Sequence, residues 1–202
     1  MKNGKKGFTL VELMIVVVIL GILAAIAIPL YMKFVQSAKA GEARLNLGKI
    51  ASLLERYYDA RANQATDLTV ALGSASTMVA AYPQNVAGGC VAPGTGQQRV
   101  PNDIASVRNM KYTPGEAEWM GPAATPYAWA DIPFSITQPI AFQYCYHGAN
   151  TATDSIFTVG AFGDVDADTV ASSFRRAGAV LCTGGTGCAP SVGAIVVTNE
   201  SE

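Results

Sequence analysis

One carboxylate, Glu12, lies in an otherwise uncharged apolar stretch that runs from Phe8 to Leu30. A charged side chain at the centre of a bilayer costs roughly 2.5–3.5 kcal/mol on insertion scales, so such a carboxylate indicates a function and a partner of opposite charge. If Phe8 became a new N-terminus, its amine would be largely protonated, because its reference pKa is about 7.7–8.0. Paired burial of the two charges costs much less than burial of either alone. Phe8 and Glu12 are four residues apart, so one chain could pair with itself.

The apolar stretch is long enough to cross a membrane. Leu13 to Leu30 contains no polar side chain, and as a helix with ~1.5 Å rise per residue it spans about 27 Å, close to the ~30 Å bilayer core. Lys2, Lys5 and Lys6 precede it and place the N-terminus in the cytoplasm. A cleaved signal peptide ending at Ala25-Ile26-Ala27 is an alternative, but the apolar run exceeds the usual length of about 7–15 residues.

The segment from Lys5 to Tyr31, KKGFTLVELMIVVVILGILAAIAIPLY, resembles the N-terminus of type IV prepilins and the related pseudopilins. The matching features are the basic leader and the residues Gly7, Phe8, Thr9, Leu10, Glu12, Gly21 and Pro29. The resemblance implies cleavage between Gly7 and Phe8 by a prepilin peptidase, followed by N-methylation of Phe8. It also implies assembly into a filament through the helix, with Phe8, Thr9 and Glu12 as assembly residues. It says little about residues beyond about 65.

The same resemblance bears on the partner of Glu12 and on a hinge. It implies that Glu12 attracts the terminal amine of a neighbouring subunit and sets the axial register. Because the spacing of Phe8 and Glu12 also allows a pair within one chain, pairing within and between chains both remain open. It further implies a hinge between Gly21 and Pro29 that loosens on assembly. Pro29 cannot donate a hydrogen bond to the Ala25 carbonyl, which predicts a kink there.

From residue 31 to about 63 the pattern predicts an amphipathic helix. Its apolar residues recur at spacings of three and four and share one face: Ala43, Leu47, Ile50, Leu54 and Tyr57. One helix from Phe8 to Asn63 would be roughly 84 Å long, far more than a bilayer requires. Its outer half is therefore expected to pack against a globular domain.

The chain is thus expected to comprise a leader at 1–7, a membrane and assembly half of the helix at 8–30, an amphipathic half at 31–63 and an extracytoplasmic domain at 64–202. In that domain, 83–139 is proline-rich and predicts a loop-rich surface connection in which Trp119 and Trp129 attach loops to the body. Antiparallel strands are predicted within 140–198, at 140–147, 155–162, 169–176, 177–182 and 192–198. A long helix followed by an antiparallel sheet gives an α+β fold.

All four cysteines lie in the domain expected outside the membrane, which favours disulfides. Of the three pairings, we favour Cys182–Cys188, which closes a short glycine-rich segment, and consequently Cys90–Cys145. A closing C-terminal disulfide also resembles pilins. Zinc is the alternative, but paired C-x-x-C spacing is absent.

Asp164, Asp166 and Asp168 resemble the start of a calcium loop. The remainder does not fit, because Thr169 stands where the turn glycine belongs and Arg175 where the bidentate glutamate belongs. We therefore expect a solvated hairpin turn and no cofactor, with bound calcium as the alternative.

Enzyme signatures are absent, since His147 is the sole histidine and neither G-x-S-x-G nor a phosphate loop occurs. His147 is expected to be structural. Removal of the leader lowers the count of basic side chains from 14 to 11 against 15 acidic ones, a net charge of −4. With no dense basic cluster, this charge does not support DNA binding.

The sequence therefore resembles a type IV pilin precursor. This resemblance implies a structural protein and not an enzyme. The expected partners are further pilin subunits in a homopolymer, the prepilin peptidase, the inner membrane before assembly and the pilus assembly machinery, with a surface pilus as the final location. One alternative is a pseudopilin of a type II secretion system. Another, from a different class, is a single-pass anchored binding domain that does not polymerise.

Overall fold

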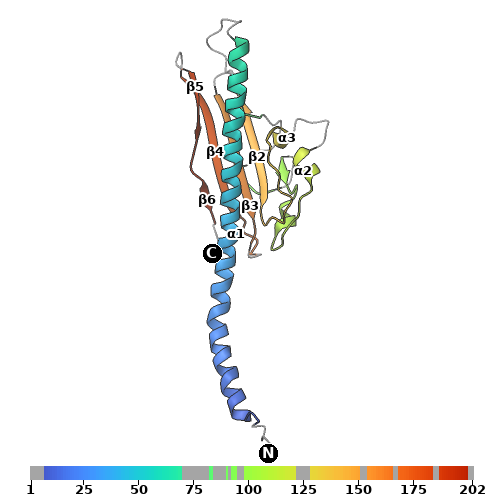
Figure 1. Cartoon of the computed structure of the whole chain (residues 1–202), viewed down its shortest axis with the longest axis vertical. Helices are drawn as coiled ribbons and strands as arrows, with labels where there is room; N and C mark the ends of the chain where they lie inside the picture. The colour runs from blue at the N-terminus through green and yellow to red at the C-terminus, as the bar shows by residue number, and fades with distance from the viewer. Residues whose placement is uncertain are drawn as a thin grey trace, which may run out of the picture. The chain divides into compact units, whose positions relative to one another are not determined.

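The structure is a computed structural model that describes residues 7–69, 82–83, 90, 92–94, 98–121, 128–150, 154–165, 168–183 and 187–199. Within these ranges it describes all side chains except those of 62–69, 154, 181–183 and 187–189. The chain divides into two compact units, Met1–Ala38 and Lys39–Glu202. The long helix α1, Leu10–Thr69, contributes to both units (Figure 1).

In the first unit α1 is helical throughout, including at Gly21 and Pro29. The sequence predicts a hinge between these two residues, and that hinge stays a prediction. At its other end α1 continues past Asn63 to Thr69, farther than the amphipathic pattern indicates. A short helix around residues 75–81 is also expected from the sequence, and it lies outside the described residues.

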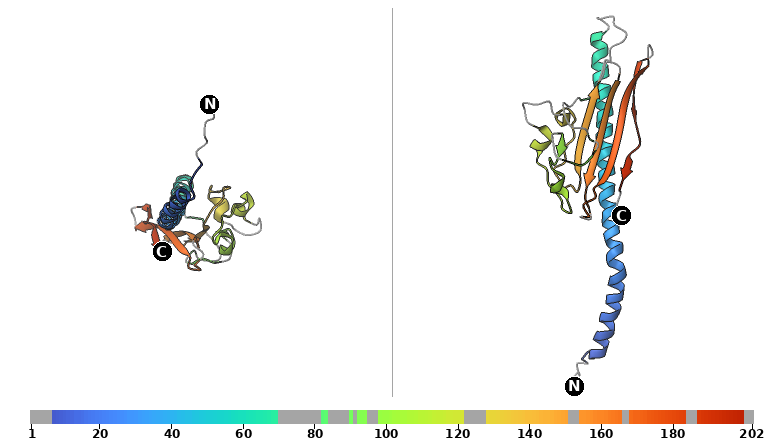
Figure 2. Two further views of the ribbon diagram at one scale, coloured as in Figure 1. Left: turned by 90° about the horizontal axis from the view of Figure 1, so that it is seen from below. Right: turned by 180° about the vertical axis from the view of Figure 1, so that it is seen from behind.

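The second unit contains one antiparallel sheet. Its strands are β1 (Arg99–Val100), β2 (Gln143–Asn150), β3 (Asp154–Gly163), β4 (Ser172–Thr183), β5 (Gly187–Val192) and β6 (Val196–Thr198). They are ordered β1-β2-β3-β4-β5, and β6 also pairs with β4. The part of α1 in this unit runs along one face of the sheet (Figures 1 and 2). The predicted α+β fold is confirmed.

The strand boundaries differ from the prediction in several places. The predicted strand 192–198 is wrong as one strand, because Val192 ends β5 and β6 begins only at Val196. The short strand β1 and most of β5 were not predicted.

The segments 169–176 and 177–182, predicted as two strands, form the single strand β4. From the sequence alone, Gly178 suggests an interruption between two strands, because glycine weakens a strand. In the structure it lies inside β4 and pairs with Phe157 of β3. A Cβ at Gly178 would collide with the Phe157 ring, so glycine is needed there because the ring lies across the strand.

The face of the sheet next to α1 carries the core. Tyr144, Ala161 and Phe174 are cross-strand partners on β2, β3 and β4, and all three are fully buried. The facing residues of α1 are Ala43, Leu47, Ile50 and Leu54, as predicted, together with Tyr58. Tyr57, predicted for this face, is only half-buried.

A buried hydrogen bond ties the helix to the sheet. Asn46 on α1 donates from Nδ2 to the hydroxyl oxygen of Tyr144 at 2.7 Å. This bond gives the Asn46 amide a polar partner inside the core, where an unpaired amide would cost about 1–3 kcal/mol. It therefore helps to set which turn of the helix faces β2.

The loop-rich segment contributes more to the core than a surface connection would. It contains the 3₁₀ helix η1 (Ile104–Val107) and the short helices α2 (Glu116–Met120) and α3 (Ala128–Asp131). Trp119, Trp129 and Phe134 from this segment belong to the same buried cluster as α1 and the sheet. The predicted role of the two tryptophans in attaching this segment is consistent with their burial.

On the opposite face of the sheet, Cys90 and Cys145 form the disulfide favoured from the sequence. It packs with Phe162 in a second, smaller buried cluster. Gly160 is the cross-strand partner of Cys145, and a Cβ there would lie 2.8 Å from the Cys90 Sγ. The missing side chain of Gly160 thus makes room for the disulfide.

One edge of the sheet is β5, which contains a proline. Pro190 pairs with Val180 of β4 and is exposed. Proline has no backbone N–H, which is why it occurs at sheet edges and rarely in central strands.

Three buried tyrosines are expected to make the free energy of unfolding depend on pH in the alkaline range. Burial raises the pKa of Tyr82 to about 12, with a smaller effect of the Glu55 charge. Burial also raises the pKa of Tyr144 and of Tyr146 above the usual range. Because these phenols ionise more readily when unfolded, their contribution is full below about pH 10 and is lost as pH rises toward the folded-state values. We expect the free energy of unfolding, measured with urea, to fall steadily from about pH 10 to 12.

Absorbance at 295 nm checks the cause of this fall. Three of the eight tyrosines should form tyrosinate only as the circular dichroism of the folded state is lost. Titration of all tyrosines near pH 10, with the circular dichroism unchanged, would contradict the prediction.

Candidate functional site

The first turn of α1 is organised by a reciprocal pair of residues, Thr9 and Glu12. The Thr9 backbone N–H donates to Glu12 Oε2 at 2.9 Å, and the Thr9 hydroxyl donates to the same oxygen at 2.8 Å. In return the Glu12 N–H donates to Thr9 Oγ1 at 3.3 Å. Thr9 precedes the first helical residue, Leu10, so this pair is a capping box.

The capping box fixes where the carboxylate lies. It holds Glu12 at the helix N-terminus, where the unpaired N–H groups and the helix dipole favour a negative charge. The residues just before it, Gly7 and Phe8, are non-helical and exposed, and a Cβ at Gly7 would meet nothing within 4 Å. The bond between them is thus accessible in the described structure.

In the uncleaved chain Glu12 contacts Thr9, and its predicted pairing with an amine stays a prediction. In the uncleaved chain the Phe8 nitrogen belongs to a peptide bond, so it carries no charge. The family resemblance places Thr9 among the assembly residues, but its contact with Glu12 is not among the predictions from the sequence. The T-x-x-E spacing before an apolar run is the signal that could have shown it.

The rest of the first unit presents an apolar surface. From Phe8 to Leu30, the large apolar side chains are between 47 and 80% exposed. Among the described residues one helix, within Leu10–Arg61, is apolar and long enough to cross a membrane, with a mean hydropathy of 3.1 over its best 18 residues. Such a surface in water would be strongly unfavourable, so lipid or other protein must cover it.

The turn after β3 holds the candidate calcium ligands. Asp164 is buried, and its Oδ2 lies 3.1 Å from Arg108 Nε and accepts a hydrogen bond from the Thr169 N–H at 3.2 Å. Asp168 is exposed and accepts from the Val170 N–H at 2.7 Å, while Asp166 lies outside the described residues. No group of three metal-ligating side chains occurs among the residues that the structure describes.

We therefore expect Asp164 to act as the partner of Arg108 rather than as a calcium ligand. The Arg108 guanidinium next to its carboxylate repels a divalent cation. Addition of millimolar calcium should leave the Tm of the chain unchanged, measured by circular dichroism with magnesium as the control. A rise of several degrees with calcium alone would contradict this, because it would show selective binding to the folded state.

Two further predictions, which concern three residues, have partial outcomes. Cys182 and Cys188 are directly opposite each other in the β4–β5 register, but their side chains are outside the description, so this disulfide stays a prediction. His147 is half-buried on β2, and its Nδ1 is buried without a hydrogen-bond partner among the described residues.

Comparisons with known proteins agree with the N-terminal features. A family model described as the prokaryotic N-terminal methylation motif matches residues 2–28. The chain is 33% identical to fimbrial protein Q of Moraxella bovis over 133 residues, which cover 58% of this chain and 85% of that protein. No solved structure shows a significant match to the chain.

Two other relatives match over shorter stretches. Fimbrial protein EcpC of Eikenella corrodens is 40% identical over 86 residues, 43% of this chain and 56% of EcpC. The type IV major pilin protein PilA of Myxococcus xanthus is 51% identical over 53 residues, 26% of this chain and 24% of PilA. The chain thus matches about half of EcpC and about a quarter of PilA.

The long helix begins with a capping box that contains a carboxylate, and its first part is apolar. Its outer part belongs to an α+β domain. Together these features define a pilin-like protein. Fimbrial protein Q matches this chain over most of its own length. The chain belongs to the type IV pilin family.

Proposed function

We propose that this chain is the precursor of a structural subunit of a type IV pilus. The observation that carries the proposal is the exposed apolar surface of α1 from Phe8 to Leu30, with the single carboxylate of Glu12 in its first turn. Before assembly lipid covers that surface, and in a filament the helices of neighbouring subunits cover it. Family membership and the relatives described as fimbrial or pilin proteins support this function.

Processing would take place at the exposed bond between Gly7 and Phe8. A prepilin peptidase would cut this bond while the chain lies in the inner membrane with its N-terminus in the cytoplasm. Cleavage turns the neutral Phe8 amide nitrogen into an amine, which is then N-methylated and remains cationic. The assembly machinery would move the mature subunit from the membrane into a filament at the cell surface.

The geometry of Glu12 suits a cross-subunit ion pair. A carboxylate has two oxygens and about four lone-pair positions, so Glu12 can accept from an amine and keep its bonds to Thr9. Pairing with the amine of the next subunit would fix the axial step between subunits, since either charge buried alone is costly. Pairing with its own Phe8 is the alternative within one chain.

The other candidate functions share parts of this plan. A type II secretion pseudopilin would use the same N-terminal helix, and an anchored binding domain would use it only to span the membrane. The named relatives favour the pilus. We further propose that the chain is a structural protein with neither a cofactor nor an enzymatic activity.

The first experiment is the mass of the N-terminal peptide of the mature protein from intact cells and from sheared filaments. N-methyl-Phe8 as the first residue of the filament protein is the expected result. An uncleaved Met1, or a start after Ala27, would overturn the proposal, because the chain would then be a simple anchor or an exported protein.

A further inference from the structure

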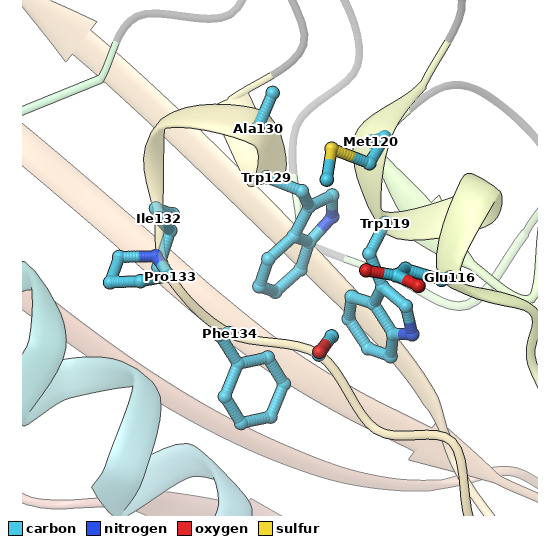
Figure 3. A pocket seen from close by; sticks show the side chains of 9 residues that line it. Glu116, Trp119, Met120, Trp129, Ala130, Ile132, Pro133 and Phe134 are labelled. Atoms are coloured by element: carbon cyan, nitrogen blue, oxygen red, sulfur yellow. The ribbon is translucent and has the colours of Figure 1, made fainter.

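The aromatic side chains of the second unit are closed to an outside partner. Figure 3 shows Trp119, Trp129 and Phe134 around a surface pocket, but they are only 2, 1 and 8% exposed and pack on one another. Within the described parts of the chain, the exposed aromatic residues all lie in the first unit, one at the start of the apolar run and two just after it: Phe8, Tyr31 and Phe34.

The charges at the two ends of the apolar run are one bilayer thickness apart. The first charged residue after Glu12 is Lys33, 21 positions along the chain. Because α1 is helical over this whole stretch, the two residues lie about 31 Å apart along its axis at ~1.5 Å per residue. The hydrocarbon core of a bilayer is ~30 Å thick. Glu12 and Lys33 can therefore lie at opposite surfaces of one bilayer, with the uncharged residues between them in lipid.

Lys33 lies between the two exposed aromatic residues in the sequence. Tyr31 and Phe34 are three positions apart and are 69 and 71% exposed, so their rings are neighbours on the helix surface. Lys33 is exposed too, and among the residues that the structure describes neither its ammonium nor the Tyr31 hydroxyl has a hydrogen-bond or ion-pair partner. Lys39, the next cation, differs, because the Glu42 carboxylate lies close enough to interact with it. Two polar groups of the first unit thus remain available at the end of its apolar run.

The need to span a membrane does not by itself explain Lys33. Tyrosine is typical of the membrane–water interface, because its ring is apolar and its hydroxyl is polar. A lysine on the outer side, in contrast, works against the excess of cytoplasmic positive charge that orients membrane helices. A neutral polar residue would end the apolar run without that disadvantage. The positive charge of Lys33 therefore indicates a partner with negative charge.

We propose that Lys33 and Tyr31 bind the phosphate group of a phospholipid in the outer leaflet of the inner membrane. This inference rests on the proposed function, since it concerns the subunit in the membrane before assembly. The apolar stem of Lys33 extends along the acyl chains and brings the ammonium to the phosphate, to which the Tyr31 hydroxyl also donates. One lysine near a membrane surface favours anionic lipids about fivefold.

The same contact fixes the height of the helix in the bilayer. With Lys33 at the outer phosphates, the spacing puts Glu12 at the cytoplasmic surface of the hydrocarbon core. The bond between Gly7 and Phe8 then lies in the headgroup region beyond that surface, where it is accessible from the cytoplasm. The carboxylate of Glu12 does not have to be buried in lipid before assembly.

Solid-state NMR tests the contact in the full-length chain, reconstituted with ¹⁵N-labelled lysine in bilayers of phosphatidylcholine and phosphatidylglycerol. Dephasing of ¹⁵N by ³¹P requires a lysine ammonium next to a phosphate, and the leader lysines are expected to add signals of their own. Lys33→Gln should lose one dephased signal. Lys49→Gln makes the same change at an exposed lysine of the second unit and should keep that signal. Equal dephasing in the unchanged chain and in Lys33→Gln would overturn the proposal.

Native mass spectrometry measures the lipid preference. From micelles with equal amounts of the two lipids, the unchanged chain should retain phosphatidylglycerol about fivefold more strongly than Lys33→Gln does. Lys33→Arg should bind as the unchanged chain does, because the guanidinium keeps the charge and suits a phosphate. Tyr31→Phe should weaken retention about twofold, since it removes one donor. Unchanged retention of phosphatidylglycerol by Lys33→Gln would also overturn the proposal.

A measurement on the same bilayers separates this inference from the proposed function. The backbone amides from Leu13 to Leu30 should exchange very slowly with deuterium, because lipid excludes water from them. Slow exchange without a contact between Lys33 and phosphate would overturn this inference alone. Rapid exchange would show that the helix does not lie in lipid, and it would overturn both this inference and the membrane stage of the proposed function.

Discussion

Replacement of Glu12 by alanine is expected to reduce filament assembly about 100-fold or more, while cleavage at Gly7 and membrane insertion continue. Removing one partner of a buried ion pair costs about 3–5 kcal/mol, because the other charge remains buried and unpaired. Under the proposed processing, the charge left behind would be the amine of the mature N-terminus. The measurement is the amount of pilin in sheared surface filaments relative to processed pilin in the membrane fraction.

A second substitution at the same position separates charge from helix capping. Glu12→Gln keeps an oxygen that can accept from the Thr9 N–H and hydroxyl, so the first turn of α1 should form normally. It lacks the negative charge, and we expect it to assemble as poorly as the alanine variant. Normal filaments from Glu12→Gln would show that Glu12 acts through the capping box and would refute the ion pair.

Loss of the Cys90–Cys145 disulfide should destabilise the globular unit by about 4 kcal/mol. The two cysteines are 55 residues apart in the sequence, and closing a loop of that length in the unfolded chain removes much of its entropy. Since a domain is typically stable by only about 5–15 kcal/mol, this is a large fraction. The measurement is urea unfolding of the chain carrying Cys90→Ala and Cys145→Ala, followed by circular dichroism.

The second cysteine pair provides the control. Cys182 and Cys188 lie opposite each other on adjacent strands and would close a loop of only a few residues, so removing both should cost about 2 kcal/mol. A larger cost for this pair than for Cys90 and Cys145 would contradict the loop-length argument.

The long helix could be predicted from the sequence, and so could its division into an apolar half and an amphipathic half. The patterns that indicate both halves are local and, in the amphipathic half, periodic. The uncharged run after Glu12 and the three–four spacing from Ala43 to Leu54 both depend on neighbours along one helix. At Tyr57 and Tyr58 the pattern offers two adjacent aromatic residues, and only packing against Tyr82 shows that Tyr58 is the buried one. The α+β fold follows from the order of these signals.

The parts that could not be predicted depend on contacts between distant residues. Gly178 has the local properties of a turn, yet the ring of Phe157 on the next strand is what keeps it inside β4. Trp119 and Phe134 lie in a proline-rich segment without a period, so nothing local indicates that they meet in the core. The Thr9–Glu12 capping box is the exception, since its spacing is visible in the sequence.

Pro190 on β5 has a consequence for the proposed filament. Polymerisation holds many identical domains at very high local concentration, where any open strand edge meets copies of itself. Edge strands with a full set of backbone donors tend to pair with one another and build disordered aggregates. Pro190 removes one donor from the β5 edge, which leaves the sheet a poorer template for such pairing. A filament built from this chain can therefore grow through its helices while its sheets remain separate.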